Sequence, residues 1–227
     1  MEFHDIAVHH ALHLANTDNC TMAALALASP QKVTVNYFSS GDVSKEWSIE
    51  MGEEESVEGV AVGEGWVAVV TSNHYLRLLS AGGMQRSVVC LPGPLVSLSG
   101  QASLLLLACH SAHPLPGQQS LSSSLYTVLP NLSLSLARAP QPLPISPNSE
   151  LYWLGFTELS APVTADSQGV VRLLDQRAGA WLPLLDTRAH SKGRSDTHYI
   201  VAVSQVEWEA RTILCRGSRY RIMYTVL

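Results

Sequence analysis

Four short segments that favour β-strands follow one another between residues 57 and 91, and each is closed by a tight-turn sequence. The segments and their turns are 57–62 before Gly63-Glu64-Gly65, 66–71 before Ser72-Asn73, 75–79 before Ala81-Gly82-Gly83, and 87–91 before Pro92-Gly93-Pro94. β-Branched and aromatic residues favour strands, whereas glycine, proline and asparagine favour turns. Four strands within about 40 residues are typical of one blade of a β-propeller.

Similar units are expected along the rest of the chain. Their opening strands are predicted near Met22, Val57, Leu95, Tyr152 and Tyr199. The spacing is uneven, which a propeller tolerates because insertions fall in the loops between strands. We therefore predict an all-β protein with a β-propeller fold. The alternative is an ordinary antiparallel sandwich or barrel without internal repetition.

Two stretches depart from the strand pattern. Phe3 to Leu14 is the one place that suggests a short amphipathic helix. The stretch from 111 to 147 is rich in serine, proline and leucine, and we predict that part of it forms a long, mobile surface loop.

The composition excludes several classes of protein. The 227 residues carry a formal net charge of −5, and charged residues make up only 15%. A disordered acidic chain or a basic nucleic-acid-binding arm would be more highly charged. The N-terminus has no apolar core typical of a signal peptide, and the apolar run 104–109 is far shorter than the ~18 residues of a membrane-spanning helix. An intracellular protein with reduced, buried cysteines is expected.

The motifs that usually carry chemistry are missing or incomplete. His9, His10 and His13 form the one histidine cluster, with no nearby cysteine or acidic partner, so packing or surface roles are favoured over a metal site. Gly63-Glu64-Gly65 lacks the third glycine of a dinucleotide fingerprint and precedes a strand, so a turn is expected. The acidic run from Asp42 to Glu58 is expected to be a solvated face. We predict no catalytic residue, no cofactor and no metal.

Positive charge gathers toward the C-terminus. From Arg172 onward there are nine basic and five acidic residues, so the preceding part is strongly acidic. The candidate nucleic-acid contacts are Lys192, Arg194, Arg216 and Arg219. A scattered, solvated surface is the alternative.

Several motifs resemble the middle region of the WD-repeat and HMG-box DNA-binding protein family, the replisome adaptors of animals and fungi. They run in family order, and among them are His9-His10-Ala11, Ser44-Lys45-Glu46-Trp47, Gly63-Glu64-Gly65-Trp66, Trp153-Leu154-Gly155-Phe156, Asp166 to Arg172, Lys192 to Asp196 and Gly217-Ser218-Arg219-Tyr220. The resemblance implies a second β-propeller, six-bladed in the family, that forms a homotrimer. It further implies a nuclear scaffold without catalytic residues that links the replicative helicase to DNA polymerase alpha.

The resemblance covers 1–220, which are expected to form a propeller incomplete at its C-terminal end, with 221–227 as a divergent tail. The family's first propeller, helical bundle and HMG box have no counterpart in the sequence, which suggests a truncated or alternatively spliced product. Two rival functions stay open. One is a small-molecule enzyme with its site in the propeller channel, and the other is a direct DNA-binding module.

Overall fold

A computed structural model gives the architecture of residues 9–17, 20–39, 45–113, 118–191, 193, 196–216 and 224–226. Side chains are described from 23 onward, except at 39, 216 and 224–226. The chain divides into two compact units. Unit 1 comprises 1–109 and 123–141, and unit 2 comprises 110–122 and 142–227.

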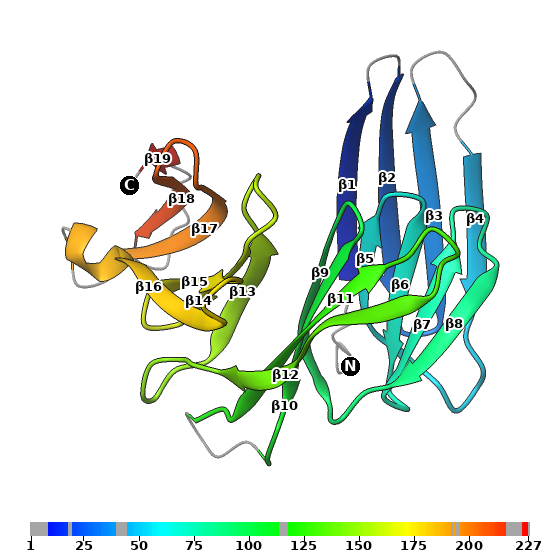
Figure 1. The fold of residues 1–227 in the computed structure, drawn as a ribbon, viewed down its shortest axis with the longest axis horizontal. Helices are drawn as coiled ribbons and strands as arrows, with labels where there is room; N and C mark the ends of the chain where they lie inside the picture. Colours follow the sequence, from blue (N-terminus) through cyan, green and yellow to red (C-terminus); the bar gives the residue numbers. More distant parts are fainter. Residues whose placement is uncertain are drawn as a thin grey trace, which may run out of the picture. The chain divides into compact units, whose positions relative to one another are not determined.

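Unit 1 contains three four-stranded antiparallel sheets, drawn from blue to green in Figure 1. The first sheet is β1 (His9–Thr17), β2 (Cys20–Ser29), β3 (Lys32–Ser39) and β4 (Lys45–Glu50). The second is β5 (Val57–Gly63), β6 (Trp66–Thr71), β7 (Tyr75–Ser80) and β8 (Gln85–Cys90). The third is β9 (Leu95–Gln101), β10 (Leu104–His110), β11 (Leu121–Val128) and β12 (Leu134–Leu143). Each sheet is a meander in which consecutive strands pair.

Unit 2 contains two further meanders, drawn from yellow to red in Figure 1. The fourth sheet is β13 (Leu151–Phe156), β14 (Pro162–Asp166), β15 (Val170–Asp175) and β16 (Ala180–Asp186). A 3₁₀ turn, η1 (Thr187–His190), leads to the fifth sheet, which is β17 (Asp196–Ser204), β18 (Glu209–Arg216) and β19 (Tyr224–Val226). No described residue lies in an α-helix. The all-β propeller fold predicted from the sequence is confirmed.

The second sheet shows why the sheets stack face to face. Successive residues of a strand point to opposite faces. Val67 and Val69 of β6 pack toward the first sheet, whereas Ala68 and Val70 pack toward the third. Every residue of β6 is therefore buried, which explains why its sequence is apolar throughout and does not alternate. In unit 2, Val163 and Leu173 pack in the same way against Ile200 of the fifth sheet.

The third strands of two sheets repeat a local motif. Arg77 in β7 and Arg172 in β15 occupy the same place in the sequences Tyr75 to Ser80 and Val170 to Asp175. The turn before each strand ends in a residue with positive φ, His74 at 58° and Gly169 at 83°. Each arginine pairs with an acidic residue, Glu55 or Asp166. This internal repeat is an independent sign of blade architecture.

The first four-stranded sheet begins one strand earlier than the sequence suggested. The stretch expected to be helical contains β1, which pairs with β2 in continuous register from His9↔Ala28 to Thr17↔Cys20. The helical prediction for Phe3 to Leu14 is thus wrong over 9–14, and 3–8 lie outside the described residues. Leu12 and Leu14 alternate with His13, which is the period of a strand. Met22 lies in the second strand, and the other openings agree within a few residues.

Much of the stretch from 111 to 147 is regular. It contains all of β11 and β12, so the predicted long loop is wrong over these strands. Serine dilutes the strand signal in β11, yet Ser123 and Ser124 are buried. The residues 224–226 of the supposed tail form β19 and pair with β18.

The cysteines divide by burial. Cys109 is buried in the core of unit 1, where burial raises the pKa of its thiol to about 11, while Cys215 is partly buried. Cys90, in the outer strand β8, is exposed, so the expectation that all cysteines are buried is wrong at this position. The side chain of Cys20 lies outside the described residues.

Candidate functional site

Two cavities lie between the fourth and fifth sheets of unit 2, each of about 790 Å³. We call them the apolar cavity and the polar cavity. The apolar cavity is lined by β15, β16 and the β17–β18 hairpin. The polar cavity is lined by the β14–β15 turn, η1 and the start of β17.

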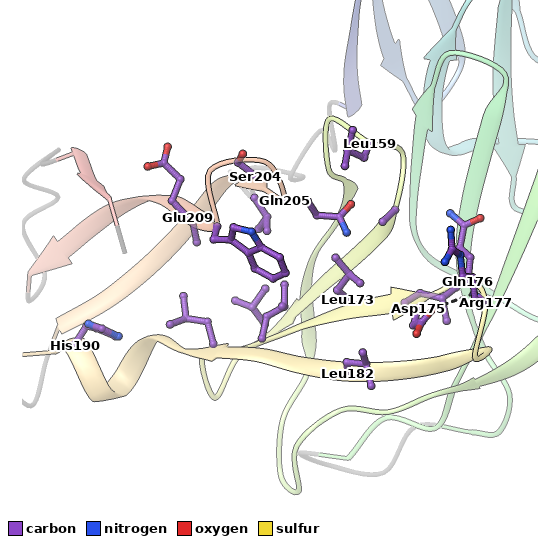
Figure 2. A pocket seen from close by; sticks show the side chains of 18 residues that line it. Leu159, Leu173, Asp175, Gln176, Arg177, Leu182, His190, Ser204, Gln205 and Glu209 are labelled. Carbon is purple, nitrogen blue, oxygen red and sulfur yellow. Dashed lines mark hydrogen bonds between the residues drawn. The ribbon is translucent and has the colours of Figure 1, made fainter.

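The apolar cavity has a wall of aliphatic side chains on the fourth sheet. Leu173 of β15 and Leu182 of β16 face the space beneath the β17–β18 hairpin in Figure 2. Leu184 of β16, Leu159 of the β13–β14 loop and Trp208 of the hairpin turn also line it. Large apolar side chains are unusual at the surface in such a group, since most of a monomer's apolar side chains are scattered. Leu159 is 62% exposed and Trp208 is 81% exposed.

The acidic groups around the apolar cavity already have partners. Asp175 Oδ1 accepts hydrogen bonds from the backbone N–H groups of Arg177 and Ala178, at 2.9 and 3.2 Å. Glu209 Oε1 accepts from Arg211 Nε at 2.9 Å, and this hydrogen bond lowers the pKa of the Glu209 carboxyl. These groups therefore stabilise turns and strand ends, and they form no acid–base pair aimed into the cavity.

Arg177 and His190 border the apolar cavity, and no hydrogen bond of either side chain is seen among the described residues. Figure 2 shows Arg177 at one end and His190 at the other. Both side chains are exposed. Among the described residues, none accepts a hydrogen bond from the Arg177 guanidinium. The chemistry offered is thus an apolar surface whose rim carries both carboxylates and one guanidinium.

The polar cavity is built around His198 and Tyr152. The Tyr152 hydroxyl donates to the carbonyl of His198 at 3.1 Å, and His198 Nδ1 lies 3.2 Å from Thr212 Oγ1. Burial lowers the pKa of His198, which favours the neutral ring. Arg188 is held by Asp186 and by Gln168, whose Oε1 accepts from Arg188 Nη1 at 2.6 Å.

The candidate nucleic-acid contacts are related to the polar cavity by sequence position only. Three of the candidates are close in sequence to residues that line the polar cavity. Lys192 lies between Ser191 and Gly193, Arg194 follows Gly193, and Arg216 follows Cys215. Lys192, Arg194 and Arg219 lie outside the described residues. Arg216 ends β18, and its side chain is not described. Their role therefore stays a prediction.

The other sequence candidates are placed as follows. His9, His10 and His13 lie in β1, and their side chains are outside the described residues. In the part of the chain with described side chains, no three His, Cys, Asp or Glu residues are grouped closely enough to hold a metal ion. Gly63-Glu64-Gly65 forms the expected turn, with Gly65 at φ 76°.

One member of the acidic run is structural, contrary to expectation. Glu55 accepts hydrogen bonds from Thr71 Oγ1 at 2.6 Å and from Arg77 Nη2 at 2.7 Å. Desolvation works against its charge, yet the hydrogen bonds from Thr71 and Arg77 lower the pKa of Glu55. The sequence could not indicate this, because Glu53, Glu54 and Glu55 are identical and only the fold selects one of them.

Sequence reasoning missed Trp208 and Leu159. Both lie in turns, where polar residues are expected, and a bulky apolar residue in such a position was the available signal. Trp47 and Trp66 have structural roles instead, since their indole N–H groups donate to the carbonyls of Ala81 and Ala102 at 2.7 and 2.9 Å.

Comparison with known proteins supplies the family context. The model of the middle region of the minichromosome loss protein Mcl1 matches residues 1–222. Proteins named WD repeat and HMG-box DNA-binding protein 1 from Xenopus laevis and Homo sapiens are 37% and 38% identical over 97% of this chain. ENHANCER OF LHP1 1 from Arabidopsis thaliana is 30% identical over 82% of this chain. The chain spans about a fifth of the length of these relatives (20%, 20% and 19%).

Solved structures support the fold. HIRA(644–1017) superposes with a TM-score of 0.50 at 13% identity, covering 77% of this chain and 58% of that one. A luciferin-regenerating enzyme superposes with a TM-score of 0.51 at 11% identity, covering 98% of this chain and 80% of that one. At such identities the likeness concerns the fold alone. No described helix is long and apolar enough to cross a membrane.

Proposed function

The chain belongs to the Mcl1 middle-region family, and from this premise we propose that it is a non-catalytic scaffold in nuclear DNA replication. In this role it presents a trimeric propeller platform that links the replicative helicase to DNA polymerase alpha. The family match over 1–222 carries the proposal, together with relatives named as WD-repeat, DNA-binding proteins.

The geometry of unit 2 supports binding better than catalysis. The carboxylates beside the apolar cavity stabilise turns, whereas its leucines and tryptophan are open to a partner. A rigid sheet framework that presents an apolar patch with a charged rim is the usual anatomy of a protein–protein interface. The likeness to a luciferin-regenerating enzyme concerns the fold and brings no reactive residue with it.

Affinity capture from nuclear extract tests the scaffold function. The immobilised 227-residue chain should enrich subunits of the replicative helicase and of DNA polymerase alpha. Its heat-denatured form is the control and should enrich neither. Light scattering should give a mass of about three chains of 24.6 kDa. A catalytically active monomer that captures neither complex would refute the proposal.

Direct DNA contact is the second candidate function, and the basic residues of the C-terminal part of the sequence favour it. If Lys192, Arg194, Arg216 and Arg219 neutralise phosphates, DNA affinity should fall steeply between dilute and physiological salt. Changing Lys192 and Arg194 to glutamate should then reduce the slope of log affinity against log salt by about one per lost phosphate contact. Arg86→Glu, an exposed arginine of unit 1, is the control. A flat salt dependence would exclude this role.

A further inference from the structure

One histidine of the fifth sheet is buried with an unused ring nitrogen. His198 of β17 is 8% exposed, and its Nδ1 lies 3.2 Å from Thr212 Oγ1 of β18. Its Nε2 is shielded from solvent and has no hydrogen-bond partner among the described residues. A protonated imidazole donates from both ring nitrogens, whereas a neutral one donates from a single nitrogen. Protonation would therefore add a second donor and a full charge at a buried site that offers one hydrogen-bond partner.

His198 also connects β17 to its neighbours. Its ring is hydrogen-bonded to Thr212 of β18, and its carbonyl accepts from the Tyr152 hydroxyl of β13 at 3.1 Å. The ring of Tyr199, the next residue of β17, lies 6.3 Å from the ring of Tyr152. β17 packs against η1 as well. A movement of the His198 ring would therefore disturb the contacts of the fifth sheet with both β13 and η1.

The surroundings of His198 favour the neutral ring. Burial has the largest effect and lowers the pKa of His198, and the nearby His190 of η1 lowers it further. Asp196 opposes this effect from the same face of β17, but its Oδ2 already accepts from the N–H of Gly193 at 3.0 Å. The other titratable side chains along the polar cavity are those of Tyr152, Arg188, Tyr199 and Cys215. Arg188 is paired with Asp186, and the side chain of Arg216, opposite Asp196 in β18, is not described.

We infer that His198 is a pH-sensitive switch that holds the β17–β18 hairpin in place at neutral pH and releases it in mildly acidic solution. The ring takes up one proton from solvent, leaves Thr212 and turns into the polar cavity, where Asp196 and water can pair with its charge. The cavity, of about 790 Å³, provides space for this movement. The hairpin then loses the contacts centred on His198, and its backbone opens more often. A partner that requires an ordered fifth sheet would be released in acid.

The direction of the effect is set by the difference between folded and unfolded histidine. An unfolded histidine has a pKa of about 6.5, and the pKa of folded His198 is lower. The opened chain therefore binds the proton first, so the free energy of opening falls as the pH drops below about 6.5. At about pH 5.5 this single site can weaken the protection of the hairpin by at most about tenfold, the limit for a ring that stays uncharged when folded.

Hydrogen exchange of the 227-residue chain at about pH 7.5 and about pH 5.5 tests the switch. After correction for the chemical exchange rate, peptides of β17 and β18 should lose protection by about threefold to tenfold at the lower pH. Peptides of β6 in unit 1 should keep theirs. In proton–carbon NMR spectra of the parent chain, the ring of His198 should titrate below about pH 6.5.

Two glutamine variants separate His198 from the other histidines. His198→Gln keeps a side chain that can hydrogen-bond to Thr212 but cannot take up a proton in this pH range, so the pH dependence of β17 should disappear. His113→Gln replaces an exposed histidine of the same unit and should lose protection in β17 as the parent chain does.

Unchanged protection of β17 in the parent chain would overturn the inference, and so would an equal pH dependence of the parent chain and His198→Gln. An equal loss of protection in β6 would also overturn it, because the whole chain would then be sensitive to acid. If His198→Gln does not fold, the ring resonance of the parent chain decides the matter. Titration of His198 at or above about pH 6.5 would contradict the switch.

Discussion

Replacing Asp166 by alanine should destabilise unit 2 by about 3–5 kcal/mol, as expected when one partner of a buried ion pair is removed. The Asp166 side chain is 0% exposed, and its Oδ2 lies 2.5 Å from Arg172 Nη1. It also accepts from the N–H groups of Ser146, Gln168 and Val170. Alanine would leave the Arg172 guanidinium, itself only 13% exposed, without its counter-charge.

The thermal midpoint of unit 2 should then fall by roughly 10 °C or more. Hydrogen exchange of peptides from β14 and β15 would show whether the loss of stability falls in this unit. Glu207→Ala removes a carboxylate from the exposed pair with Arg211 and serves as the control, which should leave the midpoint unchanged. An equal effect of both variants would contradict a special role for Asp166.

The ion pair between Asp166 and Arg172 makes the free energy of unfolding depend on pH in the acid range. Burial opposes the charge of Asp166, but hydrogen bonds from Arg172, Ser146 and Val170 prevail and lower its pKa in the folded state. A lowered pKa contributes stability above the unfolded value of about 3.9, and this contribution is lost as pH falls through the folded pKa. The difference in unfolding free energy between the parent chain and Asp166→Asn should therefore shrink below about pH 4.

Replacing Trp66 by alanine should destabilise unit 1 by about 3–5 kcal/mol, the usual effect of removing a buried tryptophan. Trp66 is 1% exposed, and its indole N–H donates to the carbonyl of Ala102 at 2.9 Å. It fills space that two glycines leave open, because a Cβ on Gly63 or Gly100 would lie 2.1 or 2.8 Å from its ring. Its loss would open a cavity between the second and third sheets and remove a hydrogen bond.

Thermal melting followed by circular dichroism, together with hydrogen exchange of β9 and β10, measures this effect. Trp66→Phe keeps most of the ring volume and should be milder than alanine. Trp208→Ala is the matched control, since it removes the same side chain from an exposed turn and should not lower the midpoint. If Trp66→Ala and Trp208→Ala shifted the midpoint equally, the packing argument for Trp66 would be wrong.

Strand order and turns were predictable because they depend on local chemistry. The turns at Gly63-Glu64-Gly65 and Ala81-Gly82-Gly83 separate apolar runs. The preference of glycine for turns depends only on the neighbouring few residues, so it can be read from the sequence. β1 was missed because strand and helix patterns are ambiguous in a short segment, and pairing with β2 decides between them. β11 was partly missed because its serines are buried by neighbours that the sequence does not show.

The site was less predictable than the fold. The basic residues chosen from sequence, such as Lys192 and Arg194, stand out by charge alone. The apolar cavity instead depends on Leu159, Leu182 and Trp208, which are up to 49 residues apart in sequence (159 to 208) and come together only through sheet packing. The sequence also does not distinguish Glu55, which accepts hydrogen bonds from Arg77, from its neighbour Glu54.

The two-sided burial of β6 has a practical consequence for trimming the protein. The side chains of β6 pack against a neighbouring sheet on each face. Deleting the first or the third sheet would therefore expose buried valine and alanine side chains to solvent. Truncated chains that begin at residue 57 or end at residue 91 should therefore aggregate. A truncation that preserves the fold must keep all three sheets.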